Sequence, residues 1–436
     1  MKFRRSRLVV LLMVVALVAG ACRDDGDDEV DAGGGGGGDE VSTDIGVTSE
    51  PCPDAVNKDH GCIYLGTISD LTKGPFAALA VPITAAQKGF WAKVNQDGGI
   101  GDYDVDVTSY VRDNEYVPTV HKAKYDEIKG KVLGLIQTLG TPTTEAIIGD
   151  LESEKVVSVP ASWTSLWAFK DVILESGTSY CMEAMNSVDW AVTDKQVKSV
   201  MAVHYPGDYG GDAAAGAKLA AERNKITFTD VPTTPGQQNQ AEAISKIIQA
   251  KPDLVILTTG PVEAGAIVGE VAVKGYKGVV VGTSPTWNPG LLKSAAAPAL
   301  QALYFQSAPW APWGADTPGH KALRDTLGAG FTPNDGATAG WVWSYAMKAA
   351  LEKAVADGDI TRAGLLEAAS GLSSVDYEGM LPEGAGNYSG EADASVVRQS
   401  LINQPDPAAP TGVKLIKDFF VGDTAKAHKL DKACYL

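Results

Sequence analysis

The sequence alternates short β-type runs with helical segments, and it does so in two separate series. The first series predicts strands at 63–68, 103–111, 132–139 and 156–162, and the second at 199–205, 226–231, 254–259 and 278–283. Helical segments of about ten to fifteen residues separate most of these strands, which is typical of parallel βαβ units with right-handed crossovers. We therefore expect an α/β fold with two doubly wound parallel-sheet lobes.

The section after residue 300 is less regular. It predicts a strand at 302–308, a loop rich in Trp and Pro, helices at 335–357 and 361–370, and two β-like runs at 394–404 and 412–420. Such a section does not form a third lobe, so we expect it to add helices and strands to the two existing ones. From residue 61 onward the chain is too long for one hydrophobic core and about right for two.

The N-terminus predicts export. Four basic residues within the first seven positions precede an apolar run at 8–18 and the small residues 19–21. This pattern is typical of a signal peptide, 1–21, and the run is too short to span a bilayer. Cys22 follows directly and resembles the lipidated cysteine of a bacterial lipoprotein lipobox. The alternative is an ordinary signal peptide with an incidental cysteine.

Residues 22–60 predict a flexible tether, because acidic residues surround six consecutive glycines at 33–38. If Cys22 is lipidated, the protein is extracytoplasmic and anchored to the outer face of the cytoplasmic membrane. The chain carries a net charge of −17, and the first 21 residues hold four positive and no negative charges, so the remainder carries −21. A field of this sign repels nucleic acid and anionic lipid, so we expect no nucleic-acid partner.

The remaining four cysteines are an even number in a chain predicted to be exported. We expect one disulfide between Cys52 and Cys62, which joins the tether to the first strand, and one between Cys181 and Cys434. A metal site is the competing interpretation. Neither pair has the CxxC spacing that zinc prefers, and the five histidines are scattered, so we favour disulfides and expect no metal and no cofactor.

Several segments, in this order, resemble type I periplasmic binding proteins, especially the branched-chain amino-acid and amide group of ABC transporters. They are IYLGTISDLTKGPFAALAVPITAAQKGFWAKVNQDGGI, VRDNEYVPTVHKAKYDEI, VHYPGDYGGD and WVWSYAMKAALEKA. The resemblance covers roughly residues 63–420. It implies two lobes, at 61–183 plus 308–401 and at 184–307 plus 402–436. Three crossing strands form the hinge between them, near 182–184, 306–308 and 401–403.

In α/β sheets, ligands bind at the carboxyl ends of the strands. Carried to this sequence, the resemblance places the ligand contacts at Phe76, Leu79, Thr141, Ala161, Ser162, Trp163, Tyr209, Gly260 and Ser284. Thr141 lies at a predicted helix start, where its hydroxyl and the helix N-terminus suit an anionic or polar group. The alternative for Thr141 is a helix cap, and both roles can hold together.

Ser284 lies close to the position where amino-acid binders of the family carry a glutamate for the ligand's ammonium group. No acid occurs between residues 278 and 300. A buried ammonium group without a carboxylate is costly, which argues against a free α-amino acid as the ligand. Tryptophans are gained instead, at Trp163, Trp287, Trp310 and Trp313. Their faces favour planar, apolar or cationic groups, or else they pack the core and hinge, as we expect for Trp341 and Trp343.

These patterns favour a monomeric, lipid-anchored binding protein that captures a small polar, aromatic or amino-acid-like solute by hinge closure. Its partner would be the permease of an ABC importer. The alternative is a ligand-sensing receptor module that signals through a partner protein. An enzyme is not expected, because the sequence has no GxSxG, HExxH or Walker motif, and no GxGxxG after a strand.

Overall fold

The computed structural model describes residues 41–207 and 209–436. The predicted signal peptide, Cys22 and the glycine run lie outside these residues, so the expectations for them stay predictions. Within the described part of the chain, no helix is both long and apolar enough to cross a membrane.

The first sheet is built around the long central strand β3 (Gly61–Ser69). Its strand order is β2-β3-β6-β7, and β4 and β5 also pair with β3. All pairings are parallel except that of β2. The other strands are β2 (Val47–Thr48), β4 (Tyr103–Asp106), β5 (Val111–Asp113), β6 (Gly134–Leu139) and β7 (Ser158–Ala161).

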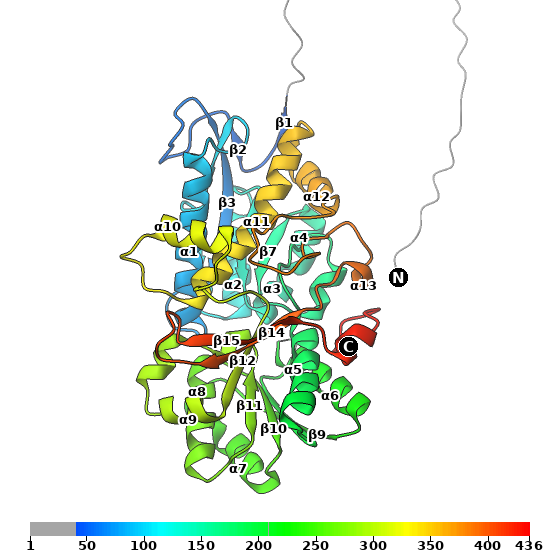
Figure 1. Cartoon of the computed structure of the whole chain (residues 1–436). Helices are drawn as coiled ribbons and strands as arrows, with labels where there is room; N and C mark the ends of the chain where they lie inside the picture. Colours follow the sequence, from blue (N-terminus) through cyan, green and yellow to red (C-terminus); the bar gives the residue numbers. More distant parts are fainter. Residues whose placement is uncertain (1–40, 208) are drawn as a thin grey trace, which may run out of the picture. The chain divides into compact units, whose positions relative to one another are not determined.

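Helices from two separate stretches of the sequence belong to this lobe (Figure 1). They are α1 (Ala77–Gln96), α2 (Pro118–Ile128), α3 (Thr141–Glu145), α4 (Ile148–Glu154), α10 (Pro318–Leu327), α11 (Asp335–Ala356) and α12 (Arg362–Ser370). α1 and α11 pack against each other, and a methyl group at Gly336 or Gly340 of α11 would collide with the backbone carbonyls of Leu79 and Ile83. Glycine at these positions therefore allows the two helices to approach closely.

The second sheet has the strand order β15-β14-β12-β11-β10-β8-β9. Its strands are β8 (Ser199–His204), β9 (Thr227–Pro232), β10 (Leu254–Thr258), β11 (Val279–Gly282), β12 (Tyr304–Ala308), β14 (Ser400–Pro405) and β15 (Val413–Phe420). β8 to β12 pair in parallel, and β14 and β15 add two antiparallel strands. Its helices are α5 (Tyr180–Lys195), α6 (Gly210–Asn224), α7 (Ala241–Ala250), α8 (Pro261–Val273) and α9 (Ala297–Leu303).

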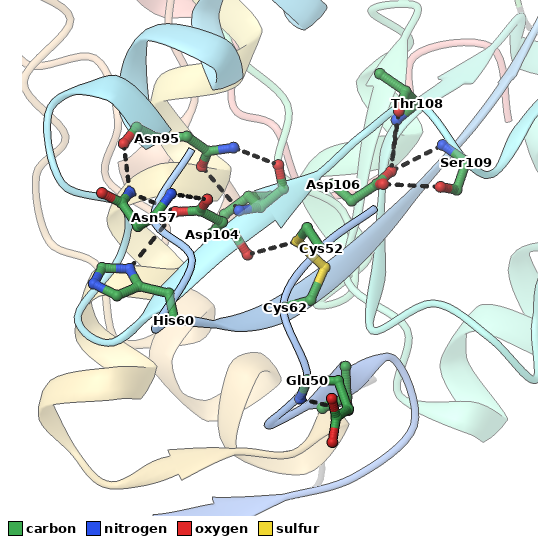
Figure 2. Close-up of a disulfide and its surroundings, with 12 residues drawn as sticks. Glu50, Cys52, Asn57, His60, Cys62, Asn95, Asp104, Asp106, Thr108 and Ser109 are labelled. Carbon is green, nitrogen blue, oxygen red and sulfur yellow. Dashed lines mark hydrogen bonds and ion pairs between the residues drawn. A yellow bond between two sulfur atoms is a disulfide. The ribbon is translucent and has the colours of Figure 1, made fainter. Parts of the chain in front are cut away.

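Short elements complete the described chain. They are β1 (Ser42–Thr43), β13 (Asp359–Ile360), α13 (Ala392–Ser395), α14 (Asp423–Ala427), and the 3-10 helices η1 (Ser165–Phe169), η2 (Gln237–Gln240), η3 (Ser284–Thr286) and η4 (Pro289–Lys293). The predicted fold class, α/β with two doubly wound lobes, is confirmed. The predicted strand at 103–111 is interrupted, because the Asp106 carboxylate accepts hydrogen bonds from the backbone N–H groups of Thr108 and Ser109 (Figure 2). This turn separates β4 from β5.

Two of the three predicted crossing segments are strands. Residues 306–308 lie in β12 and residues 401–403 in β14, and the two strands pair with each other in antiparallel register. The prediction of a third strand near 182–184 is wrong, because these residues lie in the first turns of α5. The Ser179 side chain caps that helix by accepting a hydrogen bond from the Met182 N–H. The predicted boundaries of the lobes stay a prediction.

The folded part begins earlier than the predicted end of the tether at residue 60. β1 pairs with β13, and β2 pairs with β3. Figure 2 shows how the following loop is held: the buried Asp104 carboxylate accepts hydrogen bonds from the Asn57 N–H group and the Asn57 side chain, 3.0 and 2.7 Å away. It also accepts one of 2.9 Å from the Val56 N–H group. Residues 41–60 are thus attached to the first lobe by pairing and by polar contacts that composition alone does not indicate.

Both predicted disulfides are present. Cys52–Cys62 closes a short loop against β3 and has a sequence separation of 10 (Figure 2). Cys181–Cys434 joins the first turn of α5 to the C-terminal segment across a separation of 253 residues. The Cys434 N–H also donates a hydrogen bond of 2.8 Å to the Ser165 hydroxyl. The second disulfide therefore ties the end of the chain to the start of α5.

Replacing Cys181 and Cys434 together by alanine should lower the free energy of unfolding by about 2–5 kcal/mol, because the unfolded chain loses a long-range constraint. The measurement is urea denaturation monitored by circular dichroism. The Cys52→Ala/Cys62→Ala variant is the matched control, and it should lose about 3 kcal/mol or less because its loop is short. Equal stability of wild type and the Cys181 variant would contradict the expectation.

Candidate functional site

The carboxyl ends of the two sheets face a common cavity. It holds about 590 Å³ of space between atoms, part of it open to solvent. Every predicted contact residue except Gly260 lines it: Phe76, Leu79, Thr141, Ala161, Ser162, Trp163, Tyr209 and Ser284. The structure therefore brings together residues from both lobes, and their role as ligand contacts stays a prediction.

Gly260 lies outside this lining, directly before α8. Its N–H donates a hydrogen bond of 2.9 Å to the Tyr205 hydroxyl. A Cβ atom at this position would lie 2.7 Å from a Glu263 carboxylate oxygen and 3.4 Å from the Pro75 carbonyl oxygen of the first lobe. Gly260 therefore lies where the loops of the two lobes approach each other.

Thr141 is buried in the wall of the cavity, and its hydroxyl has no hydrogen-bond partner. It is the first residue of α3, and the N-cap is Gly140, whose φ of 96° favours glycine. No side chain caps this helix, so the interpretation of Thr141 as a helix cap is wrong. A buried hydroxyl without a partner costs free energy, which a polar group of a ligand would recover.

Trp163 follows β7 and presents its ring to the cavity. Its indole N–H donates a hydrogen bond of 3.0 Å to the Ser176 carbonyl. Its ring lies 5.0 Å from that of Trp310 and 4.9 Å from that of Trp343, centroid to centroid. Because the N–H is already used, Trp163 offers the cavity its aromatic surface.

The other tryptophans divide between the two predicted roles. Trp287 and Trp310 line the cavity, whereas Trp313 stacks on Phe331 away from it. Trp343 was expected to pack its helix, but it lines the cavity as well. Its neighbour Trp341 does pack inside the lobe, where its N–H bonds the Tyr345 hydroxyl. The helical spacing of these residues did not distinguish the two faces of α11.

The loops of the two lobes touch beside the cavity. The rings of Phe76 and Tyr209 meet edge to face, with centroids 5.9 Å apart. The Asn288 side-chain amide donates a hydrogen bond of 3.2 Å to the Ala78 carbonyl. Within α1 the Ala78 carbonyl has no partner four residues on, because Pro82 has no N–H group. The carbonyl can therefore accept the hydrogen bond from Asn288 of the other lobe.

Two acids that the sequence analysis missed lie at or near this site. The Ser284 N–H donates a hydrogen bond of 3.1 Å to the Glu183 carboxyl group, and burial raises the pKa of Glu183 to about 8. Glu183 therefore lies beside Ser284, where the resemblance leads us to look for a glutamate, but it comes from α5 and not from residues 278–300. It is not among the residues that line the cavity.

The second acid, Asp335, does line the cavity. It is the first residue of α11, it is only 8% exposed, and neither of its carboxylate oxygens has a hydrogen-bond partner. Burial raises its pKa to about 7, and the nearby hydroxyl of Thr411 partly offsets this rise. Acids are common in the first turn of a helix, so the position of Asp335 in the sequence gives no sign of a role in the cavity.

The remaining lining is mainly apolar and aromatic, and it includes Ile83, Tyr116, Leu139, Tyr180 and Ala339. Such a wall suits an apolar group, and the polar atoms of Thr141 and Asp335 add sites that suit a polar one. Among the described residues, one cluster has the spacing of metal ligands: Cys181, His428 and Cys434. The disulfide occupies both of its sulfur atoms, so the thiolates that a metal requires are not available.

Comparisons with known proteins agree with this architecture. A structure of a fatty acid ABC transporter substrate-binding protein from Thermomonospora curvata superimposes with a TM-score of 0.81 at 29% identity, covering 89% of this chain and 97% of that one. A structure of a branched-chain amino acid ABC transporter from Thermus thermophilus with bound valine superimposes with a TM-score of 0.73 at 16% identity. It covers 84% of this chain and 98% of that one. A leucine binding protein from Thermotoga maritima superimposes with a TM-score of 0.69 at 16% identity, covering 83% of this chain and 99% of that one.

Comparison with curated protein sequences finds no significant match. The periplasmic binding protein family model, however, matches residues 63–406, which is most of the sequence. The chain therefore belongs to the periplasmic binding protein family.

Proposed function

We propose that this protein is the extracytoplasmic solute-binding component of an ABC importer. It captures a small solute between its lobes and presents it to the permease. The observation that carries the proposal is the cavity itself, which residues from both sheets enclose and whose wall holds buried polar atoms without partners. Membership of the family and the likeness to ABC transporter substrate-binding proteins support the same role.

The wall favours a solute with a large apolar or aromatic part. Its aromatic lining, from Phe76 to Trp343, offers surface and few hydrogen bonds, so burial of apolar area supplies most of the binding free energy. The similar protein at 29% identity is a fatty acid ABC transporter substrate-binding protein, and a fatty acid also has a long apolar body. Polar atoms, including the Thr141 hydroxyl, would fix the orientation of the head group.

Binding would proceed by hinge closure. A solute that contacts both lobes stabilises the closed form by its additional contacts there. The Phe76–Tyr209 contact and the Asn288–Ala78 hydrogen bond join the lobes independently of any solute. From the sequence we also propose that a lipid on Cys22 holds the monomer at the membrane, with the segment that precedes the folded part as its tether.

Isothermal titration against small amino acids, carboxylic acids and amines should identify solutes that bind, and small-angle scattering should show compaction with the same compounds. Trp163→Ala should then weaken binding at least tenfold, because the ring supplies apolar surface in the cavity wall. Trp313→Phe, which changes a tryptophan outside the cavity, is the matched control and should bind normally. A protein that neither binds nor compacts with any of these solutes would refute the proposed function.

Asn288→Ser should raise the dissociation constant of the solute about 2–10-fold, although Asn288 does not line the cavity. The substitution removes a hydrogen bond between the lobes that is worth about 0.5–1.5 kcal/mol. Serine can still cap η4 in place of the Asn288 oxygen that accepts from the Gly290 N–H, so the local fold is preserved. Scattering of the solute-free variant should show a more open form than wild type. An unchanged affinity together with an unchanged profile would show that this contact does not stabilise closure.

Asp335→Asn should stabilise the solute-free protein at pH 8 and lose this advantage at pH 4. The pKa of Asp335 is about 7 in the folded state against an ordinary value of 3.8, so the folded form holds the proton more tightly. The stability that the protonated Asp335 carboxyl gives to the folded state is therefore complete below pH 3.8. This stability is lost as the pH rises to about 7. Thermal unfolding should show a Tm at pH 8 higher by roughly 2–4 °C. The same difference at both pH values would argue against this titration.

A further inference from the structure

We propose that the solute is an organic cation, an amine or ammonium compound with an apolar or aromatic body, whose positive group binds Asp335. The inference rests on the proposed function and names the chemical class that the cavity takes. Asp335 becomes the residue that determines specificity, and it reaches the site from the first lobe and not from residues 278–300.

The carboxylate of Asp335 differs from those of two other buried acids, Asp70 and Asp212, which the backbone satisfies. The Asp70 carboxylate accepts hydrogen bonds from the N–H groups of Gly74 and Phe76. The Asp212 carboxylate accepts from the N–H groups of Ser165 and Cys181. Both oxygens of Asp335 lack such backbone donors, although the residue is only 8% exposed and lines the cavity. A bound molecule can therefore supply donors to this carboxylate, beside the nearby Thr411 hydroxyl.

The charge of the site favours a cation over an anion. Within the described part of the chain, no lysine, arginine or histidine lines the cavity, and Asp335 is the one carboxylate that does. A bound carboxylate would have no cationic partner and would face a group of its own charge, whereas a bound ammonium would form a buried ion pair. The net charge of −17 also draws cations toward the protein.

The aromatic surface that lines the cavity together with Asp335 suits the same class of ligand. Trp343 lies on the same helix as Asp335, and its ring contacts those of Trp163 and Trp310. Faces of tryptophan attract ammonium groups, most strongly where water is excluded. The Thr141 hydroxyl and the Trp343 indole N–H have no partners, so they can donate to a hydroxyl or carbonyl oxygen elsewhere on the solute. A cation that also carries such an acceptor fits all three groups.

The test uses the full-length protein and probes that share one body and differ in charge. Phenylalaninol is a cation with a hydroxyl group, phenylalanine is a zwitterion and 3-phenylpropanoate is an anion; octylamine and octanoate form a second pair with a linear body. Isothermal titration should show that the cation of each set binds at least tenfold more tightly than the anion. In Asp335→Asn this preference should disappear through a loss of affinity for the cation, and Asp335→Glu should restore part of it.

The possible outcomes separate this inference from the proposed function. If the anions bind best and Asp335→Asn does not weaken any cation, the inference is overturned while the proposed function stands. If phenylalanine binds more tightly than phenylalaninol, the cation class is overturned in favour of a zwitterion. If no probe binds and none changes the scattering profile, both proposals fail. Circular dichroism of each variant confirms that a loss of binding is not a loss of fold.

Discussion

The antiparallel pairing of β12 with β14 is the interaction on which the rest of the structure depends. Both strands lie where the resemblance places crossings between the lobes, and the main-chain pairs from Gln306–Asn403 to Ala308–Leu401 keep them together. The Gln306 side chain also accepts a hydrogen bond from Asn403 and lines the cavity. The paired strands and the cavity wall therefore share a residue, so a shift of these strands would alter the shape of the cavity directly.

The two lobes contribute different chemistry to that cavity. The first supplies Thr141, Trp163 and Asp335, and the close packing of α1 on α11 at Gly336 brings Leu79 and Asp335 into one wall. In the second, the Tyr209 hydroxyl is already bonded to the Thr259 carbonyl. Unsatisfied polar groups thus concentrate on the first lobe, which would engage the head of a solute before the second lobe covers it.

The sequence predicted the fold well because periodicity and turn residues are local signals. The strands β3, β6, β8 and β10 followed from such signals. The disulfides were expected instead from the even number of cysteines in a chain predicted to be exported, and the cavity-lining positions from the resemblance to a family. Asp335 could not be found in this way, since an acid in the first turn of a helix is common and only the folded chain shows that its oxygens lack partners. The prediction of a hinge strand at 182–184 was wrong for a similar reason. The Ser179 side chain caps α5, so these residues lie in a helix.

The missing glutamate near Ser284 shows how far such reasoning can mislead. A search of residues 278–300 treats the ammonium site as fixed in one loop, but a cavity between two lobes can receive a carboxylate from either side. Glu183 reaches Ser284 from a helix 101 positions earlier in the chain, and Asp335 enters from the first lobe. Glu183 accepts a hydrogen bond from the Ser284 backbone and lies outside the cavity lining, whereas Asp335 accepts none from the backbone and lines the cavity, so Asp335 is the acid placed to meet a solute. The absence of an acid in one loop therefore does not exclude a positively charged solute.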